Sequence, residues 1–514
     1  MQMEERASSF DAIVLGYGPV GAMAAALLAR RGWRVAVIDR LPDVYPLPRA
    51  VRFDGEAMRM FQELGIAAQM AADAAPIRGA EFVDAKFNRL EGLELPDGFL
   101  TSLGWPLGFM FHQPTMERAL RARVASFPNV SVFTSHEAGV PSQTRDNVCL
   151  EITPVGGGET RVLEAAYLIA ADGAASPVRK AIGSTFLSLG YDCDWVVVDV
   201  LLREDVPTLS PIVQQICDPD RIVTFVPVVG PRKRWEFRLN PGEARDDMVV
   251  PEKIWEMLSS WVTPATAEIE RAADYQFHAA IADHWREGRI FLAGDAAHQT
   301  PPFLGEGMCA GLRDAASLAW KLDHVKRGLA GDALLDTYQQ ERGPHALDLV
   351  DHAVSTGRLM DEIADAHVTG AWPTSYAAAY GGDRGFPHLH DGVLSLTADD
   401  PTDFVTGYQC PQPLVQTVDG ARRLDEIMAP EFCLLSACDL SRDLTEEDQK
   451  FLLHLGVQQI VLGPDRLLSP ELDELLGANE AIIVRPDRYV FGLVNKETGL
   501  STQLAKLRTH YLVS

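Results

Sequence analysis

Three glycines near the start of the chain have the spacing of a dinucleotide-binding turn. Gly16, Gly18 and Gly21 form a G-x-G-x-x-G pattern between a short apolar run and a stretch of strong helix formers. Glycine at these positions permits a sharp strand-to-helix turn, close approach of a pyrophosphate and tight helix–strand packing. Asp39 ends a second apolar strand, where its carboxylate can bond an adenosine ribose. The pattern predicts a βαβ unit that binds a dinucleotide at the N-terminus of its helix.

Two further predicted strands end at an aspartate. One leads into Asp295 and then into Pro302 and a glycine-rich turn at 305–308. A carboxylate in that place can accept hydrogen bonds from a polyol, and the N–H groups of a glycine turn before a helix suit the carbonyl oxygens of a flavin. The other strand ends at Asp172, with Arg179 seven positions later. Taken singly, each segment is also compatible with an ordinary strand–loop–helix joint. The single fingerprint argues against a second dinucleotide domain for a nicotinamide cofactor.

The rest of the chain indicates two more units. Residues 190–275 alternate in the manner of β-strands, and 75–104 are irregular and strand-like, so a second sheet domain is expected to face the first. The expected domains are a dinucleotide-binding domain over 1–75, 105–185 and 276–365, a substrate domain over 76–104 and 186–275, a linker over 366–412, and a C-terminal α/β domain over 413–514.

Composition and charge narrow the class of protein. The formal net charge is −26, so nucleic acids and anionic membranes are unlikely partners. No apolar run reaches 18 residues, and no basic segment followed by an apolar one precedes the first strand, which predicts a cytoplasmic protein. The seven cysteines are scattered without metal-ligand spacing, so we expect reduced thiols and no metal site.

The three motifs, in this order and spacing, resemble the single-component FAD-dependent aromatic hydroxylases of the para-hydroxybenzoate hydroxylase fold. The resemblance covers residues 10–360, and stretches such as 195–200, 235–237, 240–243 and 334–342 resemble the 3-(3-hydroxyphenyl)propionate hydroxylases in particular. It implies an α/β fold with a glutathione-reductase-like FAD-binding domain, an inserted β-sheet substrate domain and a C-terminal thioredoxin-like domain. That last domain lacks a C-x-x-C pair, and Cys433 and Cys438 are expected to be structural.

The resemblance assigns cofactor contacts to particular residues. The residues implied are Gly16, Gly18 and Gly21 for the pyrophosphate, Asp39 for the ribose, Arg40 over the adenine, Arg49 near the pyrophosphate, Gln113 at the flavin side chain, Asp172 and Arg179 in a motif linked to FAD and the nicotinamide, Asp295 at the ribityl chain, and Pro302, Gly305, Gly307 and Met308 beside the isoalloxazine. Two residues depart from the pattern. Tyr17 stands where a small residue is usual, and Glu306 stands where Gln is common.

The implied reaction uses NADH or NADPH to reduce the flavin, and O2 to hydroxylate a small phenol at a ring carbon ortho or para to the phenolic oxygen. The phenolic proton needs an acceptor. The candidates are Asp54, His112 and His278, the last on a segment that the family places near the flavin, and Pro302 is expected to border the reacting atoms. A carboxylate on the substrate would need a cation, and Arg232, Lys233, Arg234 and Arg238 form a basic patch that is also compatible with a solvated hairpin edge.

The best expectation for the substrate is 3-(3-hydroxyphenyl)propionate or a related hydroxylated aromatic acid, in aromatic catabolism. A polyketide-tailoring hydroxylase, a Baeyer–Villiger-type oxygenase and a non-hydroxylating flavin oxidase remain alternatives on the same fold. A flavin-binding regulator without enzymatic activity is an alternative of another class. Homodimers are common in the family that the chain resembles.

Overall fold

The first βαβ unit forms around the glycine pattern. Strands β1 (Ser8–Leu15) and β2 (Val35–Ile38) are parallel, and helix α1 (Pro19–Arg30) connects them. Every residue of β2 is buried, because a parallel strand inside such a sheet is covered on both faces. The computed structural model describes residues 8–374, 387–396, 405–440, 444–462 and 470–511. In these ranges no helix is both long and apolar enough to cross a membrane.

The sheet around this unit, the cofactor sheet, has the order β10-β11-β12-β1-β2-β8, with β9 on β11, β19 on β12 and β18 on β19. Its other strands are β8 (Val130–Phe133), β9 (His136–Ala138), β10 (Ser142–Gln143), β11 (Val148–Pro154), β12 (Arg161–Ala170), β18 (Arg286–Glu287) and β19 (Ile290–Leu292). Helices α4 (Gln113–Ala125) and α8 (Gly307–Lys326) pack against α1. Shorter elements of this part are β3 (Arg52–Asp54), α2 (Gly55–Glu63), α3 (Ala67–Ala72), β4 (Ala74–Pro76), β7 (Gly108–Phe111), α5 (Pro177–Ala181), η1 (Gly294–Ala296), η2 (Pro302–Leu304) and η3 (Asp332–Leu335).

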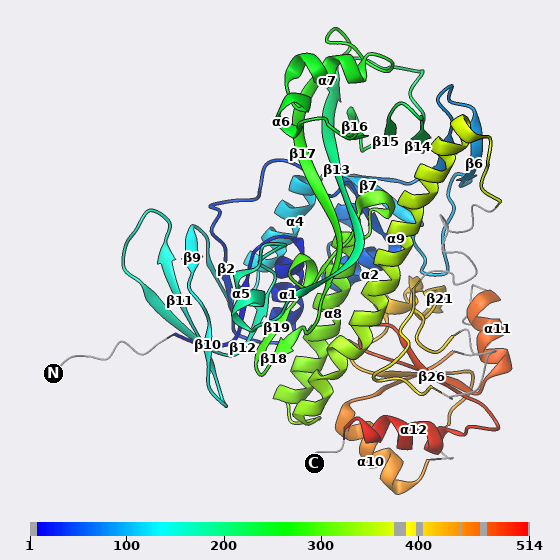
Figure 1. Ribbon diagram of the computed structural model, residues 1–514. Coiled ribbons are helices and arrows are strands. Elements are labelled where there is room, and N and C mark those ends of the chain that lie inside the picture. Colours follow the sequence, from blue (N-terminus) through cyan, green and yellow to red (C-terminus); the bar gives the residue numbers. More distant parts are fainter. Residues whose placement is uncertain (1–7, 375–386, 397–404, 441–443, 463–469, 512–514) are drawn as a thin grey trace.

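A second sheet, the substrate sheet, joins two separate stretches of the chain. Its order is β20-β17-β13-β16-β15-β14-β5-β6. The strands are β5 (Gly79–Val83), β6 (Arg89–Glu94), β13 (Phe186–Leu202), β14 (Val213–Cys217), β15 (Ile222–Val226), β16 (Arg232–Arg238), β17 (Ala267–Ala282) and β20 (His298–Gln299). The long strands β13 and β17 run from the cofactor domain toward α6 (Arg245–Met248) and α7 (Pro251–Leu258), as Figure 1 shows.

Helix α9 (Thr337–Thr369) is the longest helix described and runs beside the substrate sheet (Figure 1). Its buried side chains Val350, Val354 and Met360 share an apolar cluster with Trp195 of β13 and Phe303 of η2. The helix therefore packs against the substrate sheet and the loop before α8 at the same time.

The C-terminal domain is a four-stranded sheet with helices. Its elements are β21 (Leu414–Thr417), β22 (Gly420–Arg423), η6 (Leu424–Glu426), β23 (Cys433–Ser436), α10 (Glu446–Leu455), β24 (Gln458–Val461), α11 (Pro470–Ala478), β25 (Ala481–Val484), β26 (Val490–Val494) and α12 (Leu500–Thr509). The sheet order is β24-β23-β25-β26; β23 and β24 are parallel, and β25 is antiparallel to β23 and β26.

Much of the segment expected to be a linker is packed. Helix α9 continues to Thr369, and Val393 and Cys410 are buried in clusters with side chains of the C-terminal sheet. The backbone N–H of Gln412 donates to Ser102 O at 2.8 Å. Residues 375–386 and 397–404 of this segment lie outside the described residues. The described parts anchor the C-terminal domain because their few apolar side chains enter its core.

Candidate active site

The glycine turn has room for a pyrophosphate beside Gly18. A Cβ on Gly16 would lie 2.2 Å from Ala171 O, and one on Gly21 would lie 1.9 Å from Gly16 O, so the packing of the protein itself requires both glycines. A Cβ on Gly18 would meet nothing within 4 Å. Helix α1 starts there without a side-chain cap, so its first N–H groups remain available to phosphate oxygens. The turn therefore fits the dinucleotide that the sequence predicts.

Three aspartates surround this turn. Asp39 accepts hydrogen bonds from the backbone N–H of Tyr17 at 2.7 Å and of Leu41 at 2.8 Å. Asp172 Oδ1 is buried without a hydrogen-bond partner among the described residues, and burial raises the pKa of this carboxyl above its ordinary value. The side chain of Asp295 is exposed. An orphaned buried acceptor beside an open glycine turn suits a ligand rich in hydroxyl groups, as FAD is.

Two predicted cofactor residues are engaged by the protein itself. Gln113 Oε1 accepts from the backbone N–H groups of Arg49 at 2.8 Å and Ala50 at 2.6 Å, so this buried amide fixes the loop that carries Arg49. Arg179 donates to Ala174 O and Ala296 O and thereby joins the two loops that follow the aspartate-ended strands. Arg40 and Arg49 are exposed and available to a ligand.

The unusual Tyr17 does not obstruct the turn. Its ring is 4% exposed and lies 4.3 Å below the guanidinium of Arg121 on α4. The side chain is therefore accommodated between the turn and α4, away from the space at Gly18.

The loop before α8, which contains Pro302, Gly305, Gly307 and Met308, contacts the substrate sheet. Phe303 lies 5.5 Å from the ring of Trp195 on β13. Gly305 has φ +66° and passes over Arg52, whose side chain donates to Leu304 O at 3.0 Å. We call residues 301–308 the flavin loop, after the cofactor contact that the sequence predicts for it.

Five buried charges stand behind this loop, and we call them the flavin-loop cluster: Arg52, Asp54, Glu56, Glu306 and Arg313. Arg313 contacts all three acids: its Nε donates to Glu56 at 2.6 Å, Nη1 lies 3.3 Å from Glu306, and Nη2 pairs with Asp54. Arg52 pairs with Glu306. Burial outweighs both arginines for Glu306 and raises its pKa. Asp54, Glu306 and Cys309 could geometrically group around a metal, but the two guanidinium groups already neutralise these carboxylates.

The structure contradicts Asp54 as a proton acceptor. One carboxylate oxygen caps α2 by accepting from Ala57 N at 2.7 Å, and the other pairs with Arg313. Burial opposes its ionisation, but Arg313 and Arg52 outweigh burial, so the pKa of Asp54 lies below its ordinary value. A carboxylate so held is a weak base with no free oxygen for a substrate.

His278 pairs with an acid on the neighbouring strand. It is opposite Asp192 of β13, and its Nδ1 is 2.5 Å from that carboxylate. Its side chain is 43% exposed. Strand alternation places it on the face of β17 opposite to that of Phe277, which packs toward Phe303. These contacts do not support the role expected of His278 beside the flavin, and that role stays a prediction.

One transverse row of the substrate sheet faces the cofactor domain. Five residues pair in register across β17, β13, β16, β15 and β14, and we call them the central row: Ala273, Val197, Glu236, Thr224 and Gln215. The alternate face of β13, through Val196 and Val198, packs with Ile254 and Leu258 of α7 instead. Sequence reasoning missed this row, because only the cross-strand register brings its members together.

The neighbouring rows show what the central row faces. On one side, Trp195, Ile222 and Cys217 pack with α9 and Phe303. On the other side, Arg234 and Arg271 donate to Pro48 O, in the loop that Gln113 fixes. The central row therefore lies between the flavin loop and the loop at 48–50.

The basic patch of β16 has acidic or carbonyl partners at each position. Arg234 binds Asp199 at 2.7 Å, Arg238 pairs with Asp361 of α9, and Arg232 lies 3.3 Å from Glu270. Lys233 Nζ donates to the carbonyls of Gly230 and Arg232. His112, the remaining candidate, lies beside α4 with its Nδ1 2.8 Å from Thr115 Oγ1, and burial lowers its pKa to about 4.

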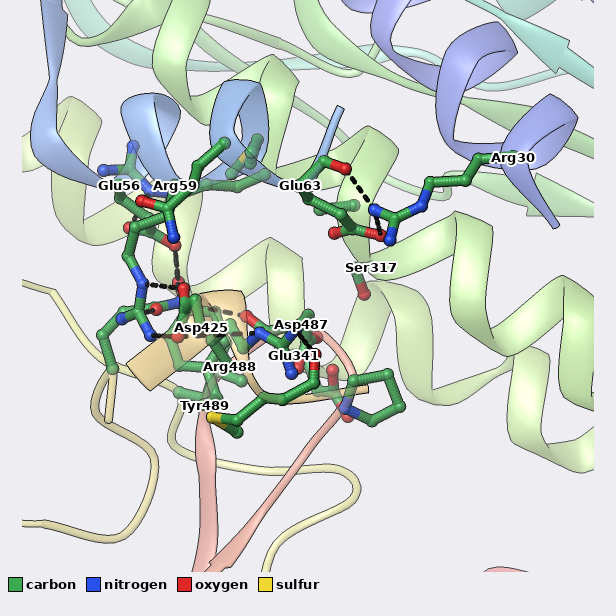
Figure 2. A pocket seen from close by; sticks show the side chains of 18 of the residues that line it. Arg30, Glu56, Arg59, Glu63, Ser317, Glu341, Asp425, Asp487, Arg488 and Tyr489 are labelled. Atoms are coloured by element: carbon green, nitrogen blue, oxygen red, sulfur yellow. Dashed lines mark hydrogen bonds and ion pairs between the residues drawn. The ribbon is translucent and has the colours of Figure 1, made fainter. Parts of the chain in front are cut away.

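A cavity of about 270 Å³ lies between the cofactor domain and the C-terminal domain (Figure 2). Its walls come from α2, α8, α9 and C-terminal segments and contain neither the fingerprint glycines nor the central row. Paired charges line it: Arg59 binds Asp425 through two bonds of 2.7 Å, and Glu56 accepts from Tyr489 Oη at 2.8 Å. The cavity marks a polar domain interface, through which Glu56 links the C-terminal domain to the flavin-loop cluster.

A cofactor sheet with this glycine turn, joined to a substrate sheet and a flavin loop, defines a flavin-dependent monooxygenase. A family model described as "FAD binding domain" matches residues 9–353, and one described as "HcaD C-terminal domain" matches residues 407–510. The chain belongs to the FAD-dependent aromatic hydroxylases, and the family, cofactor and reaction class predicted from the sequence are confirmed.

Similar proteins match over nearly the whole chain. A probable NADH-specific resorcinol 4-hydroxylase of Rhodococcus jostii (strain RHA1) is 34% identical over 509 residues, covering 96% of this chain and 93% of the relative. A 3-(3-hydroxy-phenyl)propionate/3-hydroxycinnamic acid hydroxylase of Burkholderia cenocepacia (strain HI2424) is 32% identical, covering 93% and 92%. The solved ternary complex of aklavinone-11 hydroxylase with FAD and aklavinone is 26% identical, with a TM-score of 0.80 and 99% of both chains covered.

Proposed function

We propose that the protein hydroxylates a small, uncharged phenol of the resorcinol type, with NADH as electron donor. The observation that carries this proposal is the charge of the central row, where a carboxyl, Glu236, stands among neutral side chains. An aryl carboxylate bound there would meet like charge. A matched cation would be needed, and each arginine in the adjoining rows already has an acidic partner among the described residues.

This proposal revises the substrate expected from the sequence. Two relatives bear on the choice: one is named for resorcinol and NADH, and the other for an arylpropanoate. The sequence offered Arg232, Lys233, Arg234 and Arg238 for a propanoate, and the three arginines are paired with Glu270, Asp199 and Asp361 in the structure. Removing Arg234 or Arg271 from Asp199 would leave a buried acid unpaired, which is costly, whereas the Arg238–Asp361 pair is partly exposed and would cost less to open. The uncharged phenol avoids that cost.

The chain contributes binding, orientation and exclusion of water. Bound FAD supplies the redox chemistry that joins NADH, O2 and the aromatic ring. Gly18 and the N-terminus of α1 would hold its pyrophosphate, Asp39 its ribose, and Asp172 and Asp295 its hydroxyl groups. The flavin loop would border its ring system. The central row and Trp195 would hold the phenol against that ring system, with α9 closing one side against water.

The test is a substrate panel in air with the FAD-loaded protein. We expect resorcinol to stimulate NADH oxidation with one oxygen atom added per NADH, and to exceed 3-(3-hydroxyphenyl)propionate in kcat/KM by at least about tenfold. NADPH should be the poorer donor. Preference for the propanoate would refute the choice of substrate. Hydrogen peroxide as the only product from both would refute the small phenol and redirect the search to larger polycyclic phenols.

We also propose that the C-terminal domain is thioredoxin-like without redox activity. The element order βαβαββα and the sheet order β24-β23-β25-β26 support that relationship. All seven cysteines are free, and burial raises the pKa of Cys433 to about 11, which disfavours a reactive thiolate. Its role would be structural, through the contact of Tyr489 with Glu56.

A further inference from the structure

We propose that Glu236 accepts the proton of the substrate hydroxyl while the ring is attacked. This inference rests on the proposed function, because it concerns the same site. Two of the three candidates predicted from the sequence are poorly placed for this role: Asp54 is held by Arg313, and His278 lies on the far face of the sheet.

The position of Glu236 carries the inference. It occupies the middle of the central row, between Val197 on β13 and Thr224 on β15. It is the only ionisable member of that row, and the residue is 5% exposed. Rows on either side touch the flavin loop through Trp195 and the loop at 48–50 through Arg234. A phenol lying between these loops would meet its carboxylate.

The carboxylate of Glu236 is also available. Its nearest cation is Arg234, whose Nη1 lies 3.7 Å from Glu236 Oε1, beyond hydrogen-bond distance. The guanidinium of Arg234 is committed elsewhere: Nε and Nη2 bind Asp199 at 2.7 and 3.0 Å, and Nη1 donates to Arg49 O at 2.6 Å. Within the described residues, the side chain of Glu236 accepts no hydrogen bond. The residue keeps 5% exposure, so its carboxylate remains open to a donor, and a phenolic O–H would supply one.

The surroundings make this carboxylate a stronger base than an ordinary one. Burial raises the pKa of Glu236, Arg234 lowers it, Asp199 raises it and Arg271 lowers it, and the net pKa is about 7. Arg238 of the adjoining row does not contact Glu236, and it pairs with Asp361 of α9. A phenol has a pKa of about 10. The closer the two values, the smaller the cost of moving the proton between the two oxygens.

The proton balance requires no further group. The O–H bond of the phenol breaks, the proton moves to a carboxylate oxygen of Glu236, and the electron pair left on the phenolic oxygen enriches the ring that is attacked. One negative charge is present before and after the transfer, so the buried site keeps its net charge. After oxygen is added, the C–H bond at the attacked ring carbon breaks and its proton leaves to water, and Glu236 returns its own proton to the product oxygen.

The experiment compares Glu236→Gln with Glu268→Gln, a matched change on β17 whose side chain is 64% exposed beside Arg203. Both variants should retain FAD. In Glu236→Gln, hydroxylation of resorcinol should fall about a hundredfold or more, and the loss of kcat on the acid side near pH 7 should vanish. NADH oxidation should continue and yield hydrogen peroxide. Glu236→Asp should recover part of the hydroxylation, whereas Glu268→Gln should match the wild type.

Calorimetric binding provides a readout that does not depend on turnover. Resorcinol should bind Glu236→Gln roughly tenfold more weakly than wild type, whereas 1,3-dimethoxybenzene, which has no hydroxyl proton, should bind both equally. An unchanged acid limb with unchanged resorcinol affinity would overturn the role of Glu236. If wild type binds resorcinol through Glu236 but hydroxylates no uncharged phenol, the proposed function fails while the contact stands.

Discussion

Replacing Arg313 by Met removes the residue that neutralises three buried carboxylates. Arg313 is 2% exposed and contacts Asp54, Glu56 and Glu306, so only Arg52 would remain as a counter-charge within the flavin-loop cluster. Breaking a buried ion pair from one side costs about 3–5 kcal/mol. At about 2 °C per kcal/mol for a large domain, the unfolding midpoint should fall by roughly 6–10 °C at pH 8.

The effect should depend on pH with a defined sign. Without Arg313 the pKa of Glu306, which burial already raises, would rise further above its unfolded value, so stability is retained at low pH and lost as pH rises. The loss should therefore be smaller at pH 5.5 than at pH 8. Thermal unfolding of the FAD-loaded protein measures both values. The control is Arg89→Met, which breaks an exposed pair with Glu94 and should cost about 1 kcal/mol or less. Equal losses for the two variants, or a larger loss at pH 5.5, would refute the reasoning.

Three further outcomes are expected. Gly18→Ala should fold normally but bind FAD at least about tenfold more weakly. Gly16→Ala should instead fold poorly, because its Cβ would meet Ala171 O. Titration of FAD into each apoprotein distinguishes the two variants, and equal FAD binding by both would contradict the assignment. Glu236→Gln should raise the unfolding midpoint at pH 8.5 and leave it nearly unchanged at pH 5, because a pKa raised from 4.5 to about 7 costs up to about 3 kcal/mol of stability once pH exceeds 7. Cys438→Ser should leave NADH-driven turnover unchanged, and a loss of turnover would restore a redox role for the C-terminal domain.

The cofactor half of the fold was predictable because its signals are local. The glycine turn, the aspartate after β2 and the strand before Asp295 each join a strand to a helix within a few residues, so sequence spacing suffices. The described segments at 387–396 and 405–412 were harder to predict. Their Gly and Pro content indicates a linker, whereas a few apolar side chains such as Val393 decide that they pack.

The catalytic half depends on distant pairing. Asp54 has the appearance of a base in the sequence, and its partner Arg313 lies 259 residues away. Glu236 gains its position only from the register of β16 against its neighbours. The place of His278 was not predictable from the sequence, because alternation along β17 decides its face and the register shift between Ser188 and Asp192 on β13 is not visible in a sequence pattern.

Helix α9 sets the distance between the C-terminal domain and the substrate sheet, and it also provides a packing surface. Its 33 residues span about 50 Å at 1.5 Å per residue. Near one end Glu341 binds Arg485 of the C-terminal domain, and toward the other Asp361 pairs with Arg238 of the substrate sheet. Deleting one residue between these points would turn every later side chain by about 100° around the helix axis. A change in the length of α9 between these two points is therefore expected to break one of the two contacts unless it adds or removes whole helical turns.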